Sequence, residues 1–393
     1  MKPIWPGATI GIIGGGQLGR MIALEAKRMG YRIAVLDPDA DGPAAQVADI
    51  HIAGALNNVE AARELADCSD VVTIDSEHVP ADLLRELESH TEVRPSADVL
   101  EVVQDRLQQR RFLEMNGLPQ VRHASVSSIA DLENAASKVG FPAVLKTRRE
   151  GYDGKGQVRV ESHAELIEAW DRLGRVPAML EAFAHFDKEI SAILARGLDG
   201  EIRFFTVAEN KHRQHILHIT HAPASISPSL ATRANEIGAR IATALGHVGM
   251  IAVELFVMND DHLLVNEIAP RTHNSGHYTF GGCATSHFEQ HVRAICGLGL
   301  GSPSLLRPAV MLNLLGEHWR DGEPSWSDLL AHPSAQLHIY GKKKASIGRK
   351  MGHVLVLDDE MKRAQEIVES IVQRLDSCEK PSPGRIVNTK TCQ

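Results

Sequence analysis

The amino-acid sequence predicts an α/β protein that opens with a doubly wound parallel sheet. An apolar run at residues 9–13 leads into the glycine-rich segment 14–19, and apolar residues then recur at helical spacing as far as Gly30. A second apolar run at 33–36 completes a strand–loop–helix–strand order, which is typical of parallel sheets. Ligands of such sheets bind beyond the carboxyl ends of the strands, which is where Gln17 falls.

Composition excludes several classes of function. At 393 residues the chain is too long for one compact core, so we expect more than one domain. A net charge of −8 argues against a protein built to hold nucleic acid. No apolar stretch approaches the roughly 18 residues that span a membrane. The five cysteines are scattered without metal-site or redox spacing, so we expect reduced thiols and a cytoplasmic protein.

The pattern along the chain changes twice. A charged helix at 99–115 follows the segment 94–96, and a second α/β region then extends to a glycine- and proline-rich linker at 297–303. Short strand-like runs and a basic loop at 342–350 follow the linker; the alternative for this loop is an ordinary solvated face. We therefore expect an N-terminal α/β domain at 1–98, a central region at 99–296 and a small β-rich domain at 297–393.

Two acidic residues lie where a hairpin would place them side by side. The runs 250–258 and 262–268 both read as strands, and a two-residue loop Asp260-Asp261 between them sets Glu254 opposite Glu267. Like charges directly opposite on a sheet destabilise it, and burying an unpaired carboxylate is costly. A hard cation between the two carboxylates removes both penalties.

The identity of that cation follows from the donor atoms. Asn266 adds another oxygen, and oxygen ligands with room for phosphate are what Mg²⁺ prefers. Mn²⁺ is an alternative cation. The competing interpretation is a solvated carboxylate pair on an exposed face. The dense set of donors at 270–277, directly after the hairpin, makes this second interpretation harder to sustain.

The first glycine-rich segment leaves three interpretations open. It matches G-x-G-x-x-G, and Asp37 lies where the ribose-binding acid of a dinucleotide fold would be. The segment is then an NAD site, a tight turn without a ligand, or a loop that cradles another phosphorylated ligand at a helix N-terminus.

A second glycine-rich segment, 151–157, follows the strand end at 144–146. Its glycines, lysine and aspartate suit a flexible flap whose backbone N–H groups wrap phosphate oxygens. It is not a Walker loop, because no G-K-[ST] opens a helix. A plain hairpin turn is the alternative.

Together these motifs resemble the ATP-grasp superfamily and, within it, the 5-(carboxyamino)imidazole ribonucleotide synthetase family. The resemblance extends from about residue 8 to residue 357 in the expected order. It departs from the family pattern at Arg149-Glu150 ahead of the flap, at residues 73–76 ahead of Glu77, and at Arg110, where lysine is usual. The segments that carry the resemblance are Gly15–Met21, Gly151–Gln157, Asn266–Arg271, His273–His277 and Gly348–His353.

The resemblance implies a fold and a reaction. The fold is an N-terminal α/β domain, a central ATP-grasp region with a mobile lid, and a small C-terminal β-rich domain. In the reaction, ATP, bicarbonate and aminoimidazole ribonucleotide give the N-carboxylated product, ADP and phosphate through carboxyphosphate, as a step of de novo purine biosynthesis. The resemblance also implies a homodimer.

It further implies a role for individual side chains. Glu254 and Glu267 would hold the metal. Bicarbonate and the reacting amine would lie among Tyr152, Asp153, Lys155, His273 and Asn274. The acceptor would be bound by Gln17, Leu18, Glu77, Arg271, Lys342, Arg349 and Lys350. The nucleotide would be bound by Arg106, Lys146, Gly151, Tyr152, Asp153, Gly154, Lys155, Gly156, Gln157, Glu181, Ala182, Phe183, Ala184, Glu189, His212, Asn266 and Glu267.

Three rival functions remain on the sequence alone. An NAD-dependent dehydrogenase would explain the first glycine-rich segment but would give the acidic hairpin no role. Another ATP-grasp ligase, such as a formate-dependent glycinamide ribonucleotide transformylase, would use the same nucleotide motifs. A non-catalytic nucleotide-binding regulator is disfavoured because both metal-ligand candidates are present.

Overall fold

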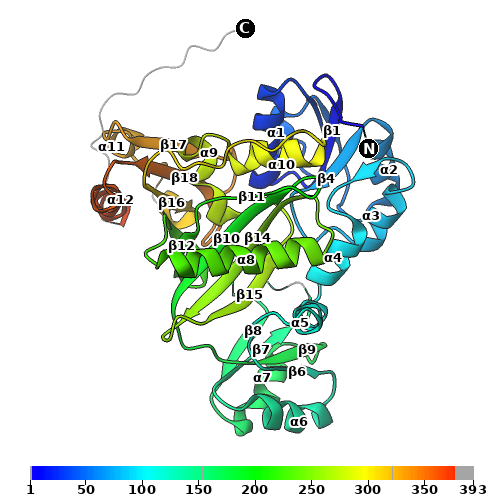
Figure 1. Ribbon diagram of the computed structural model, residues 1–393, viewed down its shortest axis with the longest axis vertical. Helices are drawn as coiled ribbons and strands as arrows, with labels where there is room; N and C mark the ends of the chain where they lie inside the picture. The colour runs from blue at the N-terminus through cyan, green and yellow to red at the C-terminus, as the bar shows by residue number, and fades with distance from the viewer. Residues whose placement is uncertain (1, 150, 152–153, 321, 377–393) are drawn as a thin grey trace.

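The computed structural model describes residues 2–149, 151, 154–320 and 322–376 (Figure 1). Its N-terminal sheet has five parallel strands in the order β3-β2-β1-β4-β5. This order confirms the predicted doubly wound sheet. The strands are β1 (Thr9–Ile13), β2 (Arg32–Leu36), β3 (Ile50–Ile52), β4 (Val71–Ile74) and β5 (Glu92–Val93), and the helices beside them are α1 (Gln17–Arg28), α2 (Val59–Asp67), α3 (Ala81–Leu87) and α4 (Ala97–Val103).

A four-stranded antiparallel sheet forms a separate lobe at the bottom of Figure 1, in the order β6-β9-β7-β8. Helix α5 (Arg106–Met115) leads into it. Asp105 caps this helix by accepting from Leu107 N at 2.9 Å. The elements of the lobe are β6 (His123–Val126), α6 (Ile129–Val139), β7 (Ala143–Thr147), β8 (Gln157–Val160), α7 (Leu166–Arg172) and β9 (Ala178–Ala182).

The largest sheet runs through the middle of the molecule in the order β15-β14-β10-β12-β13-β16-β18-β17, with β11 on β10. The C-terminal strands pair directly onto it, since β13 is hydrogen-bonded to β16. Its elements are β10 (Phe186–Arg196), β11 (Ile202–Phe204), β12 (Ala208–Arg213), β13 (Ile216–Ala222), β14 (Gly249–Met258), β15 (Leu263–Ala269), β16 (Ala309–Leu315), β17 (Ala335–Ile339) and β18 (Lys350–Leu357), and its main helices are α8 (Pro228–Ala244), α10 (His287–Ile295) and α12 (Met361–Asp376).

The hydrophobic core is shared between the first two regions. One cluster of buried side chains includes Ile74 of β4, Leu100 of α4, Leu113 of α5 and Val253 of β14. Burying these side chains together fixes the N-terminal sheet against the central sheet. In the part of the chain that the structure describes, no helix combines the length and the apolar content needed to cross a bilayer.

Candidate active site

A cleft of about 1160 Å³ lies where the three sheets approach one another. Its lining includes all but four of the residues that the family resemblance implies. Gly151 and Gly156 lie outside the lining, and Tyr152 and Asp153 lie outside the described residues. Those that line the cleft are Gln17, Leu18, Glu77, Arg106, Lys146, Gly154, Lys155, Gln157, Glu181, Ala182, Phe183, Ala184, Glu189, His212, Glu254, Asn266, Glu267, Arg271, His273, Asn274, Lys342, Arg349 and Lys350.

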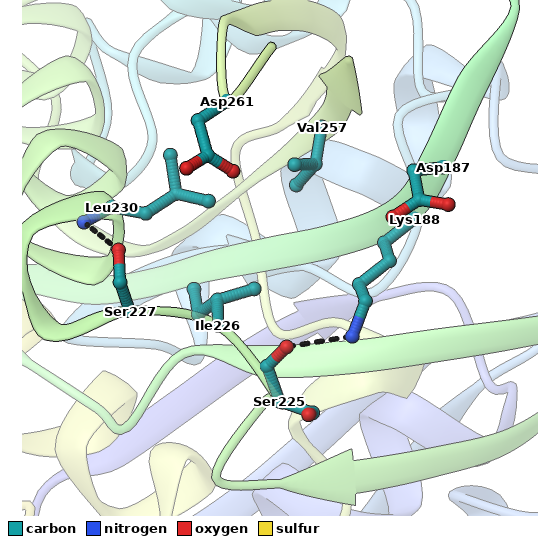
Figure 2. Close-up of a pocket in the computed structure, with 8 residues that line it drawn as sticks. All are labelled: Asp187, Lys188, Ser225, Ile226, Ser227, Leu230, Val257 and Asp261. Atoms are coloured by element: carbon teal, nitrogen blue, oxygen red, sulfur yellow. Dashed lines mark hydrogen bonds between the residues drawn. The ribbon is translucent and has the colours of Figure 1, made fainter. Parts of the chain in front are cut away.

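A smaller pocket of about 340 Å³ is shown in Figure 2 and contains none of these residues. Two of its polar side chains, Lys188 and Ser227, are already hydrogen-bonded within the protein. Lys188 Nζ donates to the carbonyl of Ser225 at 2.6 Å, and Ser227 Oγ accepts from Leu230 N at 3.2 Å. We therefore place the candidate site in the larger cleft.

Glu254 and Glu267 do face each other across β14 and β15, but the hairpin differs from the prediction. The backbone N–H of Met258 donates to His262 O at 2.8 Å, so the loop has three residues and the predicted two-residue loop Asp260-Asp261 is wrong. Asp261 closes the turn with φ of 62°, the left-handed conformation common in three-residue hairpin loops.

A β-bulge compensates for the longer loop. Without it, Glu254 would face Asn266. The register shifts after the Glu254–Glu267 pair, because Leu255 is opposite Val265, and Asn266 is the extra residue. The bulge therefore restores the carboxylate pair to a single face of the sheet.

Helix α5 holds the bulged strand from its open edge. Arg110 Nη1 and Nη2 donate to the carbonyls of Val265 at 2.7 Å and Asn266 at 2.9 Å. Gln109 Oε1 accepts from Ile268 N at 3.2 Å. These side chains supply the partners that an edge strand otherwise lacks.

A third carboxylate joins the pair. Ser191 of β10 is opposite Glu254, and Glu189 lies two residues away on the same face. Burial, together with the negative charge of Glu267, raises the pKa of Glu189 to about 7. His212 Nδ1 is 3.4 Å from Glu189 Oε2.

This concentration of negative charge suits a divalent cation. Among the described residues, however, no group of three or more His, Cys, Asp or Glu side chains forms a complete protein-only metal site. A cation at Glu254 and Glu267 would therefore complete its shell with phosphate oxygens and water, as Mg²⁺ does in nucleotide sites.

Glu181 lies at the centre of a buried ionic group. Its carboxylate accepts from Arg110 Nε at 2.6 Å and pairs with Lys146 Nζ at 2.6 Å. Burial opposes ionisation of Glu181, but the charges of Arg110 and Lys146 outweigh it and hold the pKa well below its usual value. It stays a prediction that Lys146 contacts a nucleotide phosphate and that Glu181 contacts adenine or ribose. Without a ligand the two side chains pair with each other.

The flap is anchored at its base by Arg106. Its Nη1 donates to Thr147 O at 3.0 Å and its Nη2 to Gly151 O at 2.9 Å. The predicted role of Arg106, contact with nucleotide phosphates, stays a prediction. Gly154 has φ of 79° and packs against His215 at the turn between β12 and β13, where an added Cβ would lie 2.5 Å from the His215 Cβ.

Ion pairs and hydrogen bonds connect the side chains on the acceptor side of the cleft. Arg271 and Glu77 form a close ion pair. Burial opposes ionisation of Glu77, but Arg271 lowers its pKa to about 2. Lys342 Nζ donates to Gln17 Oε1 at 2.7 Å, which joins the basic loop to the first residue of α1.

His273 lies between the acidic hairpin and the basic loop. Its Nε2 is 3.5 Å from Glu254 Oε1. Burial lowers the pKa of His273 to about 3, and the positive charges of Arg271 and Lys350 contribute. The imidazole is therefore neutral near pH 7 and can take part in hydrogen bonds, but it is a weak base.

The first glycine-rich segment is a turn closed by the protein itself. Gly15 N donates to Asp37 Oδ2 at 2.7 Å, and Gly16 N donates to Asp75 Oδ2 at 2.6 Å. A Cβ on Gly14 would lie 1.8 Å from Asp75 Oδ1. These carboxylates take the N–H groups that a dinucleotide phosphate would need, so the NAD interpretation is wrong.

An aromatic part of the lining was missed from the sequence. Phe186 and Phe256 stack with ring centroids 4.3 Å apart, and Arg159 lies 4.1 Å from the centroid of Phe183. Phe256 could have been found, because it lies two residues from Glu254 and alternation puts both on one face. The contacts of Arg110 with Glu181 and with β15 could not have been found, because the only unusual feature of Arg110 in the sequence is that lysine is usual at this position in the family.

One cleft brings together the carboxylate pair and the glycine-rich flap, the two features by which the sequence resembles the ATP-grasp class of enzymes. Family models agree: the ATP-grasp domain matches residues 111–288, the ribonucleotide synthetase preATP-grasp domain 7–104, and the phosphoribosylaminoimidazole carboxylase C-terminal domain 309–367.

Individual relatives narrow the class. An N5-carboxyaminoimidazole ribonucleotide synthase of Bacillus subtilis is 42% identical over 94% of this chain and 97% of its own length. The solved ADP complex of an N5-carboxyaminoimidazole ribonucleotide synthetase superposes with a TM-score of 0.90 at 43% identity, covering 97% of this chain and 100% of that one. An Aspergillus clavatus synthase solved with ADP and 5-aminoimidazole ribonucleotide gives 0.87 at 32% identity, covering 95% and 100%. The chain belongs to the N5-carboxyaminoimidazole ribonucleotide synthase family of ATP-grasp enzymes.

Proposed function

We propose that this protein carboxylates aminoimidazole ribonucleotide with bicarbonate at the expense of ATP, releasing ADP and phosphate. The observation that carries the proposal is that one cleft holds both the Glu254–Glu267 pair and the basic loop with Lys350. That arrangement offers a site for a metal-bound triphosphate and a second site for a phosphorylated acceptor.

The chemistry asks for positioning and charge neutralisation rather than covalent catalysis. Glu254 and Glu267 would hold Mg²⁺, with Asn266 assisting, and the ion would neutralise charge on the β- and γ-phosphates. Transfer of the γ-phosphoryl group to a bicarbonate oxygen gives carboxyphosphate, whose carboxyl group then passes to the amine with release of phosphate. His273, neutral and beside Glu254, is placed to hydrogen-bond to bicarbonate or to the reacting amine.

The acceptor would lie between the N-terminal sheet and the basic loop. Arg349 and Lys350 would bind its 5′-phosphate, because guanidinium and ammonium groups are the natural partners of phosphate. Gln17, Glu77 and Arg271 would surround the ribose and the base. Glu77 and Arg271 already form an ion pair, so the acceptor meets a pre-formed polar wall.

A homodimer in the cytoplasm completes the proposal. Among the described residues Cys68, Cys283 and Cys296 are free thiols. Burial raises the pKa of Cys283 to about 12 and that of Cys296 to about 11, so both stay protonated and unreactive. Thiols that are free, rather than joined in disulfides, support a reducing compartment.

The direct test is release of ADP. We expect ADP formation that requires both aminoimidazole ribonucleotide and bicarbonate, and a carboxylated product in equal amount. Formate with glycinamide ribonucleotide serves as the control pair. Turnover with the control pair, and none with the imidazole ribonucleotide, would assign the protein to the transformylases instead.

Lys350→Ala tests where the acceptor phosphate binds. The KM for aminoimidazole ribonucleotide should rise by the equivalent of roughly 1.5–3 kcal/mol, the range for a hydrogen bond to a charged group, while the KM for ATP stays nearly unchanged. Initial-rate kinetics with each substrate varied in turn measure both constants. A selective rise in the KM for ATP would mean that the basic loop binds the nucleotide.

A further inference from the structure

Tyr340 is fully buried at the end of β17, and its hydroxyl group joins two histidines. The oxygen lies 3.0 Å from His277 Nδ1 and 2.8 Å from His353 Nδ1. The backbone N–H of Tyr340 donates to Met351 O at 3.0 Å, which ties the same residue to β18. None of the three side chains lines the cleft.

The three residues belong to three segments that each carry a residue of the proposed site. His277 is three residues beyond Asn274, His353 is three residues beyond Lys350, and Tyr340 is two residues ahead of Lys342. The Lys342 ammonium also lies 5.8 Å from the centroid of the Tyr340 ring. A single hydroxyl group therefore connects the loop around Asn274 with both ends of the basic loop.

The protonation states of this group follow from its geometry. A hydroxyl has one proton, so Tyr340 donates to one imidazole and accepts from the other, and the two rings are opposite tautomers. Burial lowers the pKa of both His277 and His353 well below its usual value, so both are neutral. Within the described residues, neither Nε2 atom has a hydrogen-bond partner. The connection therefore suits a fixed joint between the three segments.

We propose that Tyr340 is a positioning residue for the acceptor. Its hydroxyl sets the distance between the segment that carries Lys342 and Lys350 and the loop that carries His273 and Asn274. These are the two sides between which the ribonucleotide phosphate and the reacting amine would be held. The inference rests on the proposed function and adds to it a residue that touches no substrate.

The test compares two tyrosines. Tyr278 is also fully buried, and its hydroxyl donates to Thr206 O at 2.6 Å. Tyr340→Phe and Tyr278→Phe each remove one buried hydroxyl, so we expect similar losses in Tm. Only Tyr340→Phe should raise the KM for aminoimidazole ribonucleotide, by roughly 5- to 20-fold, with the KM for ATP within about twofold of wild type.

The outcomes separate the inference from the function on which it rests. An unchanged acceptor KM in Tyr340→Phe, or equal rises in both KM values, would overturn the positioning role while the wild-type reaction stands. A wild type that does not use aminoimidazole ribonucleotide would remove the proposed function and this inference together. Should Tyr340→Phe fold poorly, His353→Asn and His353→Ala repeat the comparison: Asn keeps a polar group near the Nδ1 position and should retain acceptor affinity, and Ala should lose it.

Discussion

Glu267→Gln is expected to abolish most turnover while the protein stays folded. The change keeps the size of the side chain but removes one of the two carboxylates that face each other across β14 and β15. A loss in kcat on the order of 10²-fold or more is expected, by analogy with removing one electrostatic stabiliser of a transition state. ADP release at saturating substrates measures it.

A control variant tests whether loss of any glutamate charge lowers turnover. Glu236 is exposed on α8, so Glu236→Gln removes the same charge without touching the cleft. Its activity should equal that of the wild type. Wild-type activity of Glu267→Gln at saturating Mg²⁺ would instead show that the acidic hairpin is structural.

Arg110→Met should be the most destabilising single change that we consider. It leaves the buried carboxylate of Glu181 with Lys146 as its ionic partner and removes the donors to the carbonyls of Val265 and Asn266. Breaking a buried ion pair by removing one partner costs about 3–5 kcal/mol in the free energy of unfolding. Denaturant unfolding measures the loss, and Arg111→Met, an exposed neighbour on α5, is the control.

The same variant should alter the response to acid. The pKa of Glu181 is lower in the folded protein than its unfolded value of 4.5. Its contribution to stability is therefore complete above pH 4.5 and is lost as the pH falls toward the folded-state pKa. Arg110→Met should show a shallower loss of stability in this range. Unfolding curves that coincide with those of Arg111→Met would contradict the buried ionic group.

The N-terminal sheet could be predicted because its signals are local. The apolar run of β1, the glycines after it and the helical spacing of α1 all lie within some twenty residues. These local patterns are enough to predict a parallel sheet. The ligand of that turn could not be predicted in the same way. Asp75, whose carboxylate occupies the Gly16 N–H group, is 59 residues away in sequence.

The acidic hairpin shows a different limit. Alternation placed Glu254 and Glu267 on one face, but it carries no information on loop length or on a bulge. The three-residue loop and the extra residue Asn266 each shift the pairing by one, and the two shifts cancel. The bulge is held by Arg110, whose bonds to Val265 and Asn266 span 155 and 156 positions of sequence. Contacts between residues so far apart in sequence cannot be predicted from a short-range pattern.

The unbroken sheet from β15 to β17 has a mechanical consequence. Because the acidic hairpin and the strands that flank the basic loop belong to one hydrogen-bonded frame, these two parts of the cleft lining cannot drift apart. The four-stranded lobe is a separate sheet outside this frame, and the chain crosses into and out of it at residues 116–122 and 183–185. Phe183 and Ala184 at the second crossing also line the cleft. A nucleotide in the cleft would therefore contact this crossing as well as the central sheet, so its affinity would depend on how the lobe lies against that sheet.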